Sequence, residues 1–81
     1  MNLERAAMMG ELAQMKLQSE KLRNRIRGIA GALRVGLNTI RIAPEDLDIP
    51  VISEQNDQLT EAWGELITLK TKITDYEREL C

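Results

Sequence analysis

The chain has 81 residues, a formal net charge of -2 and 43% hydrophobic residues, with one Trp, one Tyr and no Phe. This length allows one small domain, and a lone pair of helices buries too little surface to be stable by itself. Histidine is absent, and the single cysteine, Cys81, is the last residue, so no nucleophile–base pair or metal-ligand cluster is visible. We therefore predict neither an enzyme nor a cofactor or metal site.

Hydrophobic residues in the first half of the chain recur at alternating spacings of three and four. This is the heptad a/d pattern of a helix that packs along its length against another helix. The a and d positions are Leu12, Met15, Ser19, Leu22, Ile26, Ile29, Leu33, Gly36 and Ile40. We predict a helix over about residues 2–42, with Asn2 as its N-cap.

Three glycines, Gly28, Gly31 and Gly36, interrupt the second half of this first helix, and each costs about 1 kcal/mol relative to alanine in a helix interior. Gly28, Ala32 and Gly36 recur every four residues, so they form a stripe of small side chains that another helix can approach closely. The alternative is a break between Gly28 and Gly31, which would divide the first helix and give three helices in all.

Two prolines enclose an acidic connector that we place at residues 43–50. Pro44 prevents continuation of the first helix, and Pro50 suits the first turn of the next one. We predict the second helix over residues 51–80, beginning at Pro50 or with Ser53 as N-cap. Its a and d positions are Ile52, Gln55, Leu59, Ala62, Leu66, Leu69, Ile73, Tyr76 and Leu80.

A short connector makes the two helices antiparallel, and the heptads then predict which residues face each other. Opposing a and d positions have residue numbers that add to about 95. This register places Gly36 against Leu59 and Ser19 against Tyr76, so that a small side chain meets a large one.

The two halves of the chain carry opposite charge. Residues 1–43 contain eight Lys or Arg and three Glu, a net charge of +5, whereas residues 44–81 contain ten acidic and three basic residues, a net charge of -7. The halves therefore attract each other, within one chain or between copies. The register brings Lys16 to Glu77, which attract, and Arg23 to Lys70, which repel.

Large apolar residues beside the a and d positions widen the apolar face beyond what one partner helix covers. Trp63 and Ile67 lie there on the second helix, and Leu37 lies there on the first. The fold class we predict is all-α: an antiparallel two-helix hairpin that pairs with a second copy into a four-helix bundle. The alternative is that Trp63 anchors a different protein.

The function predicted from this pattern is a non-catalytic protein–protein interaction module, such as a small coiled-coil adaptor, scaffold or assembly factor, acting as a homodimer. A small secretion-type chaperone, completed by an unknown protein partner, is an alternative. The predicted interface residues are Leu22, Ile26, Ile29, Leu33, Gly36, Leu37, Leu59, Trp63, Leu66, Ile67, Leu69, Ile73 and Tyr76.

A nucleic-acid-associated accessory protein is the other alternative, because residues 21–27 are the densest cationic stretch. Arg23 and Arg27 lie one helical turn apart and could contact phosphates together. The stretch lacks aromatic residues and the chain is acidic overall, so nucleic acid is not our main prediction. No hydrophobic run is long enough for a membrane span and no secretory leader is visible, so we predict a cytoplasmic protein without membrane association.

Overall fold

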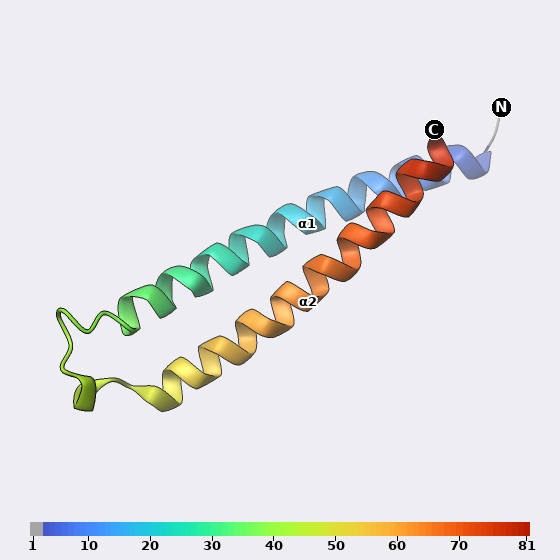
Figure 1. The fold of residues 1–81 in the computed structure, drawn as a ribbon. Coiled ribbons are helices and arrows are strands. Elements are labelled where there is room, and N and C mark those ends of the chain that lie inside the picture. Colours follow the sequence, from blue (N-terminus) through green and yellow to red (C-terminus); the bar gives the residue numbers. More distant parts are fainter. Residues whose placement is uncertain (1–2) are drawn as a thin grey trace.

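The protein is an antiparallel pair of long helices, as Figure 1 shows for a computed structural model that describes residues 3–81. Helix α1 spans Leu3–Gly36, a short 3-10 helix η1 spans Pro44–Asp46, and helix α2 spans Ile49–Leu80. The described residues contain no strand, so the predicted all-α fold with two helices packed against each other is confirmed.

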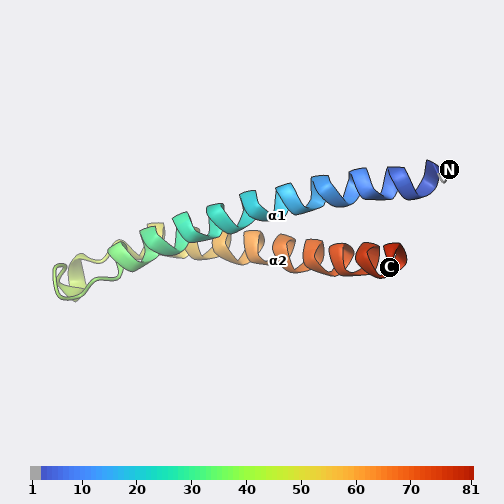
Figure 2. The same ribbon diagram turned by 90° about the horizontal axis from the view of Figure 1, so that it is seen from above.

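The hairpin is a thin rod that measures 65 × 15 × 15 Å. Its radius of gyration is 18.4 Å, whereas a compact domain of this length would have about 12 Å. The N-terminal turns of α1 extend past the end of α2, as Figure 2 shows. Each helix therefore has one neighbour only, and its other sides face solvent.

Helix α1 ends at Gly36 and not near residue 42 as predicted. The reason is Asn38, whose side-chain oxygen accepts a hydrogen bond from the amide of Ile40 at 3.1 Å. Its carbonyl also accepts from the amides of Arg41 and Ile42, at 3.2 and 3.0 Å. Asparagine competes with helical hydrogen bonding in this way, so residues 38–42 form a separate turn.

The glycines do not break α1, which is continuous through Gly28 and Gly31, so the three-helix alternative is wrong. A Cβ atom added at Gly36 would lie 3.7 Å from Cγ1 of Ile52, which is ordinary van der Waals contact. No atom lies within 4 Å of a Cβ added at Gly28 or Gly31. Of the glycines that the structure describes, only Gly36, the last residue of the predicted stripe, therefore faces α2.

Helix α2 begins earlier than predicted because Asp48 caps it. The Asp48 side chain accepts a hydrogen bond from the amide of Val51 at 3.3 Å, and Pro50 occupies the first turn. Ser53 lies inside the helix, so it is not the N-cap. The predicted cap of the first helix, Asn2, lies outside the described residues.

The predicted register is wrong by one heptad. Gly36 contacts Ile52 rather than Leu59, and the hydroxyl of Tyr76 donates a hydrogen bond to Glu11 at 2.6 Å. Residue numbers in these two contacts add to 88 and 87 rather than 95, whereas the flanking ion pair of Lys16 and Glu77 adds to 93. The cause lies at the helix ends. Because α1 ends and α2 begins earlier than predicted, the chain turns back at lower residue numbers than the predicted helices imply.

Burial follows the three-four spacing along both helices. The least exposed residues are Ser19, Leu22, Ala62 and Leu69, with relative exposures of 3, 7, 0 and 8%. The Ser19 hydroxyl, although buried, donates to the carbonyl of Lys16 at 2.7 Å, so it is not left unpaired. The other a and d positions at 12–36 and 52–80 are half-buried.

Ile40 departs from this pattern, because it is 96% exposed. It was predicted to be an a position of the first helix, but the helix ends before it. The few buried residues also mean that the contact between α1 and α2 is narrow, so it leaves much apolar surface uncovered.

Candidate interaction surface

The predicted interface residues divide into two groups in the hairpin. Leu22 and Leu69 are buried between the helices, and eight others are half-buried there. Those eight are Ile26, Ile29, Leu33, Gly36, Leu59, Leu66, Ile73 and Tyr76. The remaining three, Leu37, Trp63 and Ile67, are 49, 57 and 42% exposed, so about half of each residue faces solvent.

These exposed side chains belong to one flank of the α1–α2 contact. On α2 the flank includes Trp63 and Ile67, and on α1 it includes residues that follow each other at three-four spacing. We call this surface the Trp63 face and define it by Arg27, Ala30, Arg34, Leu37, Trp63 and Ile67. On α1, Arg27 lies one turn from Arg23, and on α2, Ile67 and Trp63 lie one and two turns from Lys70.

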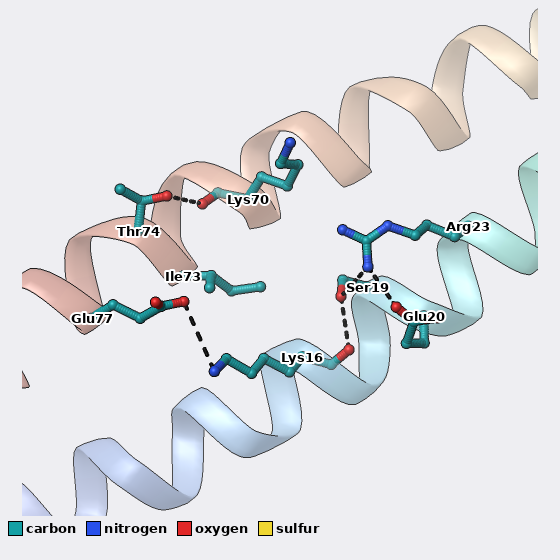
Figure 3. Close-up of a pocket in the computed structure, with 8 residues that line it drawn as sticks. All are labelled: Lys16, Ser19, Glu20, Arg23, Lys70, Ile73, Thr74 and Glu77. Carbon is teal, nitrogen blue, oxygen red and sulfur yellow. Dashed lines mark hydrogen bonds and ion pairs between the residues drawn. The ribbon is translucent and has the colours of Figure 1, made fainter.

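Polar residues farther along the same flank show that the α1 and α2 residues of the Trp63 face lie on the same side of the hairpin. Lys16 of α1 and Glu77 of α2 form an ion pair at 3.9 Å, as Figure 3 shows, which confirms their predicted proximity. Both residues line a shallow groove of about 400 Å³ together with Arg23 and Lys70. Residues at three-four spacing from these four therefore share the flank that carries Trp63.

Arg23 and Lys70 line the same groove. This agrees with the prediction that the two cations lie at the same height along the hairpin, where they repel each other. Arg23 turns instead to its own helix, where it donates to Glu20 at 2.6 Å and to the hydroxyl of Ser19 at 3.5 Å (Figure 3). Since the ion pair with Glu20 is exposed and lies within one helix, it contributes little to stability.

The two arginines predicted as phosphate contacts make hydrogen bonds within α1. Arg23 is engaged by Glu20, and Arg27 donates to the side-chain oxygen of Asn24 at 3.0 Å. The carboxylate of Glu20, which pairs with Arg23, partly neutralises the positive charge of the two arginines. The geometry therefore gives no additional support to a nucleic-acid interface.

An apolar groove that the sequence analysis missed lies on the other flank, at the loop end of the rod. It has a volume of about 490 Å³, and Asp46 and Asp48 contribute carboxylates to its lining. We call it the loop-end groove; its lining residues are Gly31, Ala32, Val35, Gly36, Ile42, Asp46, Asp48, Val51, Ile52 and Gln55. Val35 and Val51 are 71 and 45% exposed, so the groove is open to solvent.

The signal for this groove was present in the sequence. Gly36 followed by Asn38 is a typical helix-stop combination, so the chain reversal begins at residue 37 and not at residue 43. Once the reversal lies there, Val51 and Ile52 come beside the last turn of α1. Extending the first helix to residue 42 hid this arrangement.

At the other end of the rod, Tyr76 of α2 donates a hydrogen bond to Glu11 of α1. This hydrogen bond and the negative charge of Glu11 raise the pKa of the Tyr76 hydroxyl above its ordinary value of 10.0. The pair is solvent-exposed and links the two helices.

Among residues 3–81, no three His, Cys, Asp or Glu side chains are grouped closely enough to hold a metal ion. Neither α1 nor α2 has an apolar stretch sufficient to cross a membrane within that range. Comparison with protein-family models, with curated proteins and with solved structures found no match to this chain.

Proposed function

We propose that the protein is a non-catalytic interaction module that self-associates, with a second copy covering the apolar residues beside the α1–α2 contact. The observation that carries this proposal is the exposed area. The accessible surface is 6315 Å², whereas a compact monomer of 9.2 kDa would expose about 4,900 Å². The excess of about 1,400 Å² per chain is larger than the roughly 800 Å² that each partner typically buries in a stable interface.

The identity of the exposed side chains supports the same proposal. Trp63, Ile67 and Leu37 are among the large apolar residues that face solvent, and the buried core consists of only three apolar side chains in the described residues. So few buried side chains do not offset the conformational entropy of ordering two long helices. Association removes apolar surface from water without any change in the hairpin itself.

A second copy fits this surface because the chain is complementary to itself in charge. The half containing α1 has a net charge of +5 and the half containing α2 has -7, from the counts above. Packing two hairpins so that α1 of one lies beside α2 of the other places opposite charges together. Four helices packed through a and d positions and their flanks are the simplest such assembly.

The biological role that follows is an adaptor, scaffold or assembly factor that acts through helix–helix contacts. A foreign protein that supplies the missing helices, as a chaperone's client would, is the competing possibility. The two differ in one respect: a self-associating module is complete when purified, whereas a module with a foreign partner stays monomeric until that partner is added.

The double substitution Trp63→Ser with Ile67→Ser tests the proposal. Both side chains are exposed in the hairpin, so their loss should leave helix content unchanged and weaken self-association by at least about tenfold. Light scattering after size exclusion measures the mass, and circular dichroism measures the helix content. Leu17→Ser is the matched control, because Leu17 is 53% exposed on α1 and lies on neither surface.

Unchanged association in the Trp63 and Ile67 variant would show that the Trp63 face is not the contact surface. Equal weakening by Leu17→Ser would show that overall hydrophobicity, and not this face, drives association. Either result would contradict the proposal.

A further inference from the structure

We infer, resting on the proposed self-association, that copies associate asymmetrically, with the Trp63 face of one copy docked on the loop-end groove of the next. The alternative is a symmetric contact in which two Trp63 faces meet. Charge and shape on the described residues distinguish these two arrangements.

The Trp63 face is basic on its α1 side, because Arg27 and Arg34 belong to it. No acidic residue occurs among the residues that define this face. A symmetric contact with α1 beside α1 would bring two sets of arginines together, and like charges across an interface cost several kcal/mol when they are desolvated.

The loop-end groove is acidic at its edge. Asp46 and Asp48 line it, and Glu54 follows Val51 by one helical turn on the same flank. Its floor is apolar, with Ala32 and Ile52 among the lining residues. An apolar surface with a cationic edge, which is what the Trp63 face presents, matches both properties of the groove.

Shape favours the same pairing. The Trp63 face carries large side chains that project from the rod, since Trp63 and Ile67 are exposed. The groove is hollow because Gly31 and Gly36 contribute no side chain to its lining. A large residue against a recess of small ones is the arrangement that close packing of two helical surfaces requires.

The two surfaces lie on opposite flanks of the α1–α2 contact, so one contact leaves each copy with an unused surface. Such a heterologous contact does not close after two copies. The assembly then continues into longer oligomers or closes as a ring. Its mass should exceed that of a dimer and, for an open assembly, should increase with protein concentration.

Charge reversal tests the inference. One variant, Asp46→Lys with Glu54→Lys, makes the groove basic and leaves Asp48 in place as the cap of α2. The other variant, Arg27→Glu with Arg34→Glu, makes the Trp63 face acidic. Each variant alone should associate about tenfold more weakly than the wild type, because its own two surfaces then repel.

Mixing the two variants in equal amounts should restore association, because the acidic Trp63 face of one meets the basic groove of the other. An unfolded variant could not give this rescue, so it separates a docking effect from misfolding. The matched control is Asp75→Lys with Glu79→Lys, which changes the same number of charges at the far end of α2 and should associate like the wild type. Sedimentation equilibrium measures the wild type, the two variants, their mixture and the control.

The results also separate this inference from the proposed function. A wild-type protein that self-associates, with a groove variant that associates equally well, would overturn the docking on the groove and leave self-association intact. A mixture without rescue would overturn it too. A wild-type protein that stays monomeric would overturn the proposed function itself.

Discussion

At the residue scale, Gly36 is the glycine that lies closest to the opposite helix among the described residues. Replacing it with leucine should destabilise the protein by about 1–3 kcal/mol, because the added side chain overpacks against Ile52 although leucine is the better helix former. Thermal unfolding followed by circular dichroism measures the change.

The control is Gly10→Leu, since no atom lies within 4 Å of a Cβ added there. This variant should instead gain up to about 1 kcal/mol from helix propensity. If Gly36→Leu raised the melting temperature as well, the last turn of α1 would have to face solvent and the register described above would be incorrect.

Tyr76 gives an independent test of the register through its titration. It is the only tyrosine, so tyrosinate absorbance reports on it alone. Its pKa should lie above 10.0, because Glu11 accepts its hydrogen bond and repels the tyrosinate, and Glu11→Gln should lower this pKa toward the ordinary value. Glu61→Gln, remote on α2, is the matched control and should leave the pKa unchanged.

The sign of the stability effect follows from the raised pKa. The neutral hydroxyl is favoured in the folded state, so its contribution is fully present below the unfolded pKa and is lost as pH rises through the raised one. A titration that Glu11→Gln leaves unchanged would mean that Glu11 and Tyr76 are not paired.

At the scale of the elements, the sequence was sufficient to predict two antiparallel helices but not their ends. The hydrophobic spacing continues to Ile40, which led the predicted helix past Gly36. Periodicity alone does not show where backbone hydrogen bonds are diverted, and here the side chain of Asn38 diverts them. An error of a few residues at each helix end then moved the whole register by one heptad.

The start of α2 gives a prediction that distinguishes its two possible caps. Asp48→Ala should destabilise the protein by about 0.5–2 kcal/mol, because it removes the side-chain acceptor for the Val51 amide. Ser53→Ala should have almost no effect, since Ser53 is exposed inside the helix. Urea unfolding at constant protein concentration measures both. A larger loss for Ser53→Ala would place the helix start one turn later.

At the scale of the whole molecule, composition and charge predicted an all-α chain with exposed apolar flanks, and Trp63, Ile67 and Leu37 are exposed as their positions beside the a/d pattern imply. The loop-end groove could not be predicted in the same way. It depends on Val51 and Ile52 lying beside Gly31 and Gly36, which only the observed register brings together. Hydrophobic periodicity therefore predicted the exposed flanks, whereas the loop-end groove also required the end of α1, which Gly36 and Asn38 signal.

The molar mass of the purified wild-type protein in solution tests self-association most directly. Sedimentation equilibrium at micromolar concentrations should give at least twice the chain mass of 9.2 kDa, with dissociation on dilution. A mass of one chain at every concentration, with the helices still formed by circular dichroism, would show that the hairpin is stable with its apolar flanks in water and would contradict self-association.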